Sequence, residues 1–211
     1  MIRILLIDDH AVVRAGYHRF LERNEDLKVV AEAADAEHAY AQFRQHKPDV
    51  SICDLSMPGA GGLTVIRRIV GLDRLARILV FSMHEDAVFA VRSLQAGARG
   101  YVTKNCEPET LVEAVRQIHA GRSYFSPDIA QRLALGRGDA DPLSVLSAKE
   151  FEVFRLIAEG RSVTDIAFAL SLSQKTVANY QALIKEKLGA TTTTALVHIA
   201  LRNGVIAPTG Q

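Results

Sequence analysis

The sequence of 211 residues lacks several features that mark particular classes of protein. Cys53 and Cys106 are its only cysteines and do not form a metal-ligand pattern, and its seven histidines are scattered without zinc-type spacing. Two thiols in a chain of this length are typical of a reduced, cytosolic protein. We therefore expect neither a structural zinc site nor a disulfide framework.

Long apolar runs are also missing, since none approaches the roughly 18 to 20 residues that are needed to span a bilayer. The N-terminus has no basic region followed by a small-residue cleavage site, so residues 2–7 are expected to form a strand and not a signal peptide. The net charge of +1 gives no overall attraction to nucleic acid, so any DNA-binding surface must be local. These absences favour a cytoplasmic protein of one or two domains without membrane association.

The sequence divides into two halves with different patterns. Residues 1 to about 120 alternate short β-rich runs with helical stretches. Five strands alternating with five helices predict an α/β fold, a doubly wound parallel sheet that is covered on both faces. The predicted strands are residues 2–7, 27–33, 50–53, 78–82 and 100–102. The predicted helices are residues 11–22, 36–46, 62–70, 86–96 and 108–120.

The pattern changes after Gly121. Ser126 and Pro127 predict the start of a short helix, with serine as the cap and proline at the first position, and residues 136–142 form a turn-rich linker. Further helices are predicted at residues 148–159, 163–170, 174–188 and 192–203. We expect a domain over residues 1–121, a linker with a short helix over 122–145, and a smaller all-α domain over 146–211.

Three carboxylates follow two of the predicted strands. Asp8 and Asp9 come directly after residues 2–7, and Asp54 comes directly after residues 50–53. In an open parallel sheet of strand order 2-1-3-4-5 these two strands are neighbours, and ligands bind beyond their carboxyl ends. Crowded carboxylates repel one another, and the usual solution is a hard divalent cation, typically Mg²⁺. We therefore predict a Mg²⁺ site here.

Two further polar residues complete the predicted site. Ser82 ends the fourth strand, and Lys104 lies just after the fifth. Asp54 is a candidate nucleophile, because aspartyl-phosphate formation needs only in-line attack and charge stabilisation. Lys104 would place a positive charge near the phosphoryl oxygens, and Ser82 would donate a hydrogen bond.

This set of residues, together with Tyr101, resembles the flavodoxin-like receiver domain of two-component response regulators. The stretches 54–59 and 97–104 match that family closely. The resemblance implies that a sensor histidine kinase phosphorylates Asp54 and that Ser82 and Tyr101 form the switch. The Mg²⁺ ligands that it implies are Asp9, Asp54 and the backbone carbonyl of Ser56, with Asp8 acting partly through water.

Other residues near this site receive simpler interpretations. Asn105 stands where many receivers have a proline after a cis peptide bond, so no cis proline is expected. Cys53 is expected to be a buried core thiol, and His10 a first-turn residue at the rim. His84 is expected to be exposed to solvent near the entrance.

Residues 164–177 have the pattern of helix, tight turn and helix, and the second helix can enter a DNA major groove. The segments 146–150, 175–177 and 187–189 resemble the LuxR-type helix-turn-helix of NarL/FixJ regulators. Tyr180 and residues 129–135 are faintly similar to GacA/UvrY-type members. Winding residues 173–188 as a helix separates a packed face, which carries Val177 and Ile184, from an outer face. The expected DNA contacts are Lys175, Thr176, Ala178, Asn179, Ala182, Lys185 and Lys187.

From residue 146 onward the chain has seven lysines and arginines against five aspartates and glutamates, a local balance of +2. Because DNA affinity scales with the number of phosphates that a protein neutralises, a single domain should bind weakly. Binding of a homodimer to paired half-sites of double-stranded promoter DNA is therefore expected.

The sequence thus predicts a DNA-binding response regulator and not an enzyme. Phosphorylation of Asp54 would control homodimerisation and the transcription of target genes. A dehydrogenase would carry a glycine-rich loop after the first strand, but residues 8–11 contain no glycine. The remaining alternatives are a phosphatase that uses the same carboxylates and Mg²⁺, a DNA-binding protein with a vestigial receiver, and a helical interaction module.

Overall fold

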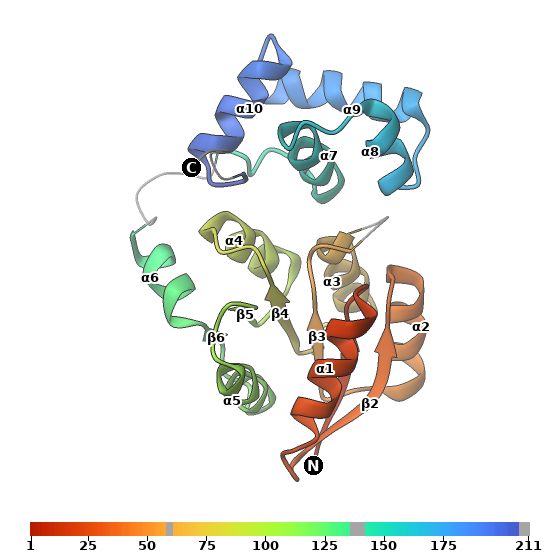
Figure 1. The fold of residues 1–211 in the computed structure, drawn as a ribbon, viewed down its shortest axis with the longest axis vertical. Helices are drawn as coiled ribbons and strands as arrows, with labels where there is room; N and C mark the ends of the chain where they lie inside the picture. Colours follow the sequence, from red (N-terminus) through yellow and green to blue (C-terminus); the bar gives the residue numbers. More distant parts are fainter. Residues whose placement is uncertain (58–60, 136–141, 207–211) are drawn as a thin grey trace.

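The computed structural model describes residues 1–57, 61–135 and 142–206. Its N-terminal part is one parallel sheet in the order β2-β1-β3-β4-β5-β6, with helices on both faces (Figure 1). The strands are β1 (Ile2–Ile7), β2 (Leu27–Ala33), β3 (Val50–Cys53), β4 (Ile78–Ser82), β5 (Gly100–Thr103) and β6 (Tyr124–Phe125). The helices of this part are α1 (Ala11–Leu21), α2 (Ala36–His46), α3 (Gly61–Leu72), α4 (Ala87–Ala96), α5 (Pro108–His119) and α6 (Pro127–Leu135).

The sheet has an apolar core on each face because its strands alternate their side chains between the two sides. Ile4 and Leu6 of β1 face α1 and α5, whereas Leu5 and Ile7 belong to the core under α2, α3 and α4. Strands β3 and β4 are buried at every position, as expected for strands covered on both faces. The predicted α/β fold and its strand order are confirmed.

The prediction of five strands was wrong by one. β6 pairs with β5 in parallel, with Tyr101 opposite Phe125, and the backbone N–H of Ser126 donates to the carbonyl of Tyr101 at 3.0 Å. Helix α6 follows and packs against α4 and β5, burying Ile129 completely. A strand of two residues is too short to show periodicity in a sequence. The first part of the predicted linker therefore extends the sheet and its helical cover.

The C-terminal part consists of helices alone among its described residues. They are α7 (Ala148–Ala158), α8 (Val163–Ala169), α9 (Gln174–Lys187) and α10 (Thr193–Arg202). Each begins at a hydroxyl side chain that accepts a hydrogen bond from the third residue of the helix: Ser147, Ser162, Ser173 and Thr192. Residues 136–141 of the predicted linker and residues 207–211 lie outside the described part.

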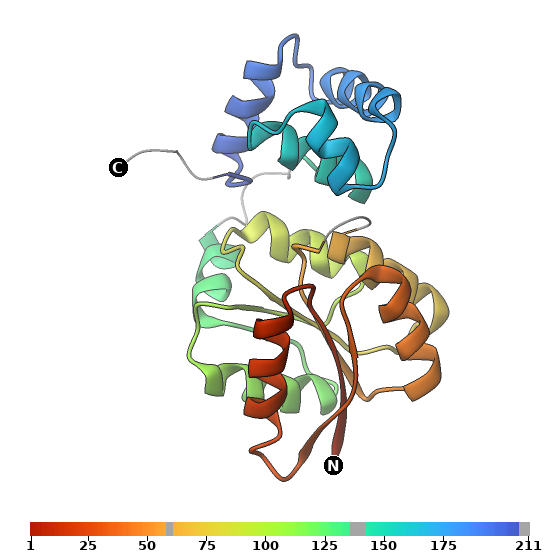
Figure 2. The ribbon, with the colours of Figure 1, turned by 45° about the vertical axis from the view of Figure 1, so that its right-hand side comes forward.

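Helix α7 joins the two parts by packing against α3 and by ring contacts with α4 (Figures 1 and 2). Phe89 of α4 meets Phe151 of α7 edge to face, with ring centroids 5.6 Å apart. Helix α9 lies on the side of this small domain that faces away from the sheet. In the described ranges, no helix combines the length and the apolar composition that crossing a membrane requires.

Candidate functional site

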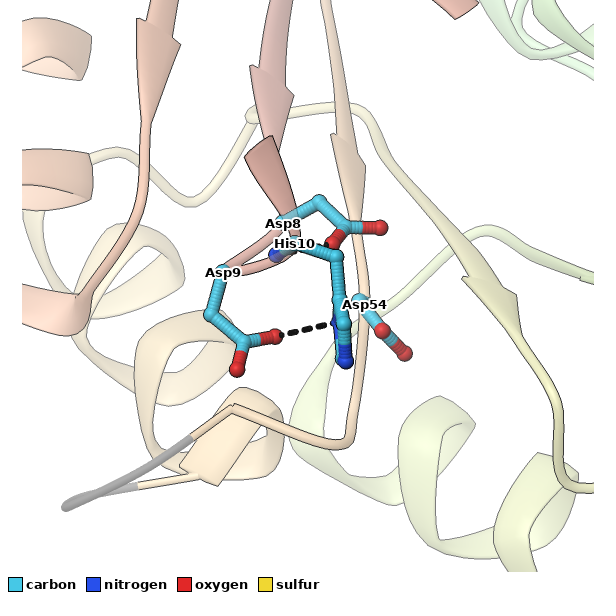
Figure 3. Close-up of side chains that lie close together, drawn as sticks. All are labelled: Asp8, Asp9, His10 and Asp54. Carbon is cyan, nitrogen blue, oxygen red and sulfur yellow. Dashed lines mark hydrogen bonds and ion pairs between the residues drawn. The ribbon is translucent and has the colours of Figure 1, made fainter. Parts of the chain in front are cut away.

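The predicted carboxylates meet at the carboxyl ends of β1 and β3. Asp8, Asp9, His10 and Asp54 each offer one ligand atom, and these atoms all lie within 4.8 Å of one another (Figure 3). Asp8 and Asp54 are each only 3% exposed. The backbone fixes them, since the N–H of Asp54 donates to the carbonyl of Ile7 at 2.9 Å. Adjacent strands therefore hold the acidic groups together.

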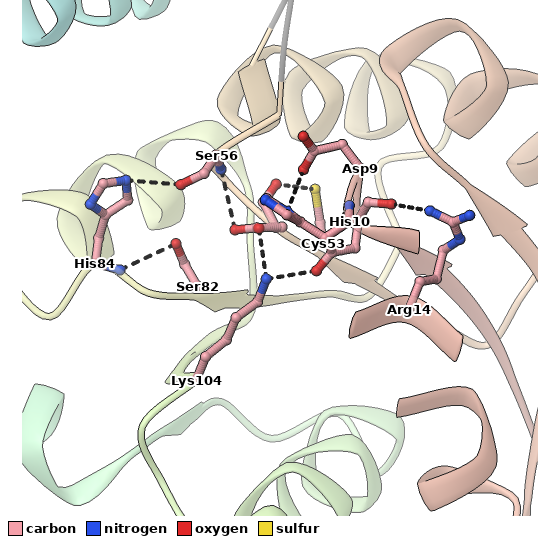
Figure 4. Close-up of polar contacts among 10 residues, drawn as sticks. Asp9, His10, Arg14, Cys53, Ser56, Ser82, His84 and Lys104 are labelled. Carbon is pink, nitrogen blue, oxygen red and sulfur yellow. Dashed lines mark hydrogen bonds and ion pairs between the residues drawn. The ribbon is translucent and has the colours of Figure 1, made fainter. Parts of the chain in front are cut away.

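Lys104 offsets part of the negative charge of this cluster (Figure 4). Its Nζ donates to Asp8 Oδ2 at 2.6 Å and to Asp54 Oδ2 at 2.7 Å. The lysine is held in place because its backbone N–H donates to the carbonyl of Ser82 at 2.8 Å. Burial alone would lower the pKa of Lys104, but Asp54 and Asp8 outweigh it, so the pKa is raised above its ordinary value. Lys104 therefore stays charged in the pocket.

The remaining oxygen atoms of the pocket fit a hard cation. Asp9 Oδ1 is buried without a hydrogen-bond partner, and its near neighbour is His10 Nδ1 at 3.0 Å. The backbone N–H of Ser56 donates to Asp54 Oδ1 at 3.2 Å, which sets the Ser56 peptide beside the acidic cluster. Carboxylate and carbonyl oxygens are the ligands that Mg²⁺ takes. Asp9, Asp54 and the Ser56 carbonyl could hold the ion, with Asp8 nearby.

Tyr101 lies fully inside the protein. It is 0% exposed, and burial raises its pKa. Its hydroxyl donates to the carbonyl of His84 at 2.8 Å. Because β6 pairs with the backbone of Tyr101 and α6 packs on β5, this side chain is enclosed. Ser82 is also completely buried, at the end of β4.

His84 is a neighbour of the pocket that the sequence did not indicate. We expected it to be exposed, but its Nε2 shares a hydrogen bond with Ser56 Oγ at 3.1 Å, and its ring stacks on Phe89 with centroids 4.0 Å apart. Burial, followed by the nearby charge of Arg155, lowers the pKa of His84 to about 4. A single loop histidine has no sequence pattern that would reveal such packing.

Other residues lie as expected. Cys53 is buried in the core, and burial raises the pKa of its thiol. The side chain of His10 is 61% exposed at the rim of the pocket. No cis peptide bond occurs within residues 1–57, 61–135 and 142–206, so the bond between Lys104 and Asn105 is trans.

Helix α9 has the two faces that its periodicity predicts. Val177 and Ile184 are completely buried against the other helices. Lys175, Ala178, Asn179 and Ala182 are exposed on the outer face, and Thr176 and Lys185 are half-buried at its edges. The tight turn before α9 contains Ser171 in a left-handed conformation, with φ of 52°. An exposed helix with this outline can enter a major groove.

Lys187 differs from the other candidate DNA contacts. Its Nζ donates to both carboxylate oxygens of Glu150, each at 2.8 Å. The same carboxylate accepts the backbone N–H of Ser147 and completes a capping box at the start of α7. Lys187 thus ties α9 to α7, and its charge faces Glu150.

Two protein-family descriptions match most of this chain. Residues 4–116 match the response regulator receiver domain. Residues 144–200 match the bacterial regulatory proteins of the luxR family. The two matches coincide with the sheet that carries the carboxylates and with the helices that surround α9.

Individual relatives cover almost the whole chain. Response regulator GacA of Pseudomonas aeruginosa is 39% identical over 210 residues, covering 98% of each chain. Response regulator UvrY of Escherichia coli K12 is 37% identical over 209 residues, covering 97% of this chain and 96% of the relative. RcsB of Salmonella enterica serovar Typhimurium, solved bound to a promoter with the phosphomimetic BeF3−, is 32% identical with a TM-score of 0.69, covering 94% of this chain and 97% of RcsB.

These matches agree with the geometry, since a pocket of carboxylates with one lysine lies at the strand ends and an exposed helix lies in the second domain. The chain therefore belongs to the NarL/FixJ family of two-component response regulators, which join a receiver domain to a LuxR-type DNA-binding domain.

Proposed function

We propose that Asp54 accepts a phosphoryl group from a sensor histidine kinase and that this modification controls promoter binding through α9. The observation that carries the proposal is the lysine bridge, in which Lys104 Nζ contacts Asp8 at 2.6 Å and Asp54 at 2.7 Å inside the acidic cluster. A carboxylate held beside a fixed cation and metal-binding oxygens suits in-line attack on phosphorus.

Each residue of the pocket has a distinct part in this step. Asp54 attacks with one carboxylate oxygen, forms the new oxygen–phosphorus bond, and the kinase histidine departs as the leaving group. Lys104 places its ammonium group beside the phosphoryl oxygens and stabilises the negative charge that accumulates there. Ser82 donates its hydroxyl to the same group. When bound through Asp9, Asp54 and the Ser56 carbonyl, Mg²⁺ supplies charge neutralisation and orientation.

The output that we propose is transcriptional control by a homodimer on double-stranded promoter DNA. Lys175 and Lys185 would contact phosphates, whereas Asn179 would contact base edges. Ala178 and Ala182 would allow close approach to the groove, and Thr176 would support the phosphate contacts. The balance of +2 in the second domain supports a dimer, because one copy neutralises few phosphates. A regulator of this kind acts in the cytoplasm, where the promoters are.

The domain division stays a prediction, with residues 1–121 and 146–211 as domains and 122–145 between them. The pairing of β6 with β5 supports a receiver unit that continues to the end of α6. Limited proteolysis of the full chain would test the division, since cleavage should concentrate between α6 and α7.

Beryllofluoride provides the decisive test, because it occupies an aspartyl-phosphate site without a transfer reaction. With Mg²⁺ and beryllofluoride, the full chain should bind its promoter about tenfold more tightly than without them. Asp54→Ala should abolish this gain, whereas Asp73→Ala, which changes an aspartate outside the pocket, should keep it. An equal gain in Asp54→Ala would disprove the phosphoacceptor assignment. Failure of the wild-type receiver to bind Mg²⁺ would instead favour a vestigial pocket.

A further inference from the structure

Three groups around the phosphoacceptor contact one residue, His84. The Oγ of Ser56 shares a hydrogen bond with His84 Nε2 at 3.1 Å, and the backbone N–H of His84 donates to Ser82 Oγ at 3.4 Å. The hydroxyl of Tyr101 donates to the carbonyl of His84 at 2.8 Å. Figure 4 shows the contacts of His84 with Ser56 and with Ser82 at the end of β4. The enclosed Tyr101 adds the third contact.

The opposite side of His84 leads to the DNA-binding domain. Its ring lies flat on Phe89, with planes only 7° apart, and Phe89 meets Phe151 of α7 edge to face. Arg155, one turn further along α7, is close enough to lower the pKa of His84. A continuous row of packed rings thus connects the pocket to α7, and packed side chains of this kind can carry coupling between sites.

Arg92 of α4 also contacts α7 and the chain just before it. Arg92 is only 4% exposed, and its guanidinium lies 3.9 Å from the centre of the Phe151 ring. It also donates to the carbonyl of Leu146, at 3.2 Å, and to that of Leu143. Both carbonyls belong to the chain just before α7. A buried cation with these partners makes the contact of α7 with α4 specific.

This docked arrangement leaves α9 uncovered. Lys175, Asn179 and Ala182 of its outer face are exposed although α7 is packed against α3 and contacts α4. The ribbon shows α9 on the far side of the small domain from the sheet (Figure 2). Docking therefore restricts the orientation of the DNA-binding domain without masking its groove-entering helix.

We propose that His84 is the positioning residue through which a phosphoryl group on Asp54 releases α7 from α4. The proposal rests on the phosphoacceptor function proposed above and adds its route to the second domain. A phosphoryl group brings two negative charges and three strong acceptors beside Ser56 and Ser82. Both hydroxyls then turn towards it, so Ser56 Oγ and Ser82 Oγ move out of reach of His84. His84 loses these partners on the pocket side and no longer holds Phe89 against Phe151.

Occupation of the pocket and docking of α7 are linked equilibria, so each affects the other by the same factor. If occupation of the pocket disfavours docking, then weakening the docked state must favour occupation by the same factor. Arg92→Ala in the full chain should raise beryllofluoride affinity about fivefold with Mg²⁺, as measured by calorimetry. In a His84→Ala background, Arg92→Ala should change the affinity less than about twofold, because the route is cut. Arg68→Ala, which changes an exposed pair with Glu37, is the matched control and should leave the affinity unchanged.

A second measurement distinguishes release of α7 from α4 from the exposure of a previously covered α9. Without phosphodonor, Arg92→Ala should bind a single half-site within about twofold of wild type, because α9 is accessible in the docked form. Hydrogen exchange of α7 should rise on addition of beryllofluoride in wild type but not in His84→Ala. If Arg92→Ala lowers the melting temperature of either domain, Arg92→Met, which keeps the apolar stem, replaces it.

The outcomes are distinct. If wild type does not bind beryllofluoride, the proposed function itself is wrong. If wild type binds but Arg92→Ala has the same affinity, only the release of α7 is wrong. An equal gain from Arg92→Ala with and without His84 would show that the route bypasses this residue, and a tenfold gain in half-site binding would show that docking masks α9.

Discussion

The pocket of the receiver and the outer face of α9 differ in how much of their geometry is set before a ligand arrives. In the pocket, Asp8 and Asp54 are almost completely buried and both accept hydrogen bonds from Lys104. On α9, Lys175 and Asn179 project from an exposed helix face. The receiver is preorganised by its own charges, whereas the DNA-binding face acquires its partners from DNA.

The difference has an energetic consequence. Breaking a buried ion pair costs several kcal/mol because an uncompensated charge is left in a poorly solvated site. Exposed charges contribute little to folding, since water and salt screen them. Changes in the pocket should therefore affect stability and binding together, whereas changes on the outer face of α9 should affect DNA binding alone.

The largest expected effect follows from removing the lysine bridge. Lys104→Ala should lower the free energy of unfolding by about 4 kcal/mol without Mg²⁺, because Asp8 and Asp54 lose their shared cation. Saturating Mg²⁺ should recover much of this loss, since the ion binds only the folded pocket. Urea unfolding with and without Mg²⁺ measures both effects. Lys28→Ala, which removes a half-exposed pair with Glu22, is the control. A loss below about 1 kcal/mol would contradict the preorganised pocket.

Lys187 belongs to α9, but like Lys104 it is paired with a buried carboxylate. Lys187→Met should lower the free energy of unfolding by about 2 kcal/mol at pH 7, since Glu150 loses two charge-assisted hydrogen bonds. Lys175→Met, on the exposed face, should leave stability unchanged. Chemical unfolding of the two variants gives the comparison directly, and equal stabilities would remove the distinction between the two lysines.

The same pair predicts a pH dependence. Burial alone would raise the pKa of Glu150, but Lys187 and the cap at Ser147 outweigh it, so the folded pKa lies below its ordinary value. The unfolded chain therefore binds this proton more readily, and the stabilisation is present above about pH 4.3 and is lost as the pH falls through the folded pKa. The stability difference between wild type and Lys187→Met should shrink in that acidic window. A constant difference from pH 7 to pH 3 would contradict the assignment.

Variants on the outer face of α9 should distinguish residues that recognise the DNA sequence from residues that contribute affinity for any DNA. Asn179→Ala should weaken cognate binding about tenfold and random-duplex binding less than about twofold, because an asparagine reads base edges. Lys185→Ala should weaken both about equally and reduce the salt slope by about one. Fluorescence anisotropy on cognate and random duplexes over a salt series makes the measurement. Identical behaviour of the two variants would count against the assigned face.

The smallest expected effect concerns Glu186, an exposed acidic residue on the same helix. Glu186→Gln should tighten binding to all duplexes about twofold at low salt, because it removes a charge that repels phosphates. Glu113→Gln, on the receiver, should have no effect. Tightening that persists unchanged at high salt would show that the cause is not electrostatic.

Features that depend on local sequence were predicted well. The helices expected at 148–159 and 174–188 match α7 and α9 to within a residue, because Ser147 and Ser173 are caps whose partners lie three residues on. The convergence of Asp8 and Asp54 was predictable because parallel strands end at a common edge.

Features that depend on contacts between distant segments were not predicted. Arg92 meets Leu143 across 51 positions, and Lys187 meets Glu150 across 37. His84 is packed by Ser56 and Phe89, which lie in different parts of the chain. β6 was missed because two residues carry no periodic signal. In each case the decisive information is which surfaces pack together, and no short segment contains it.

The anchoring of α6 on the sheet has a further consequence for the chain that follows it. Leu135 ends α6, and the described chain resumes at Pro142, so seven Cα steps can span at most roughly 25 Å. A tether of this length keeps α7 near α4 at an effective concentration in the millimolar range. A contact between separated domains whose dissociation constant lies well below that concentration would then be closed most of the time. A second copy that binds the released domain must therefore compete with the contact between α7 and α4 of the same chain, which the tether favours.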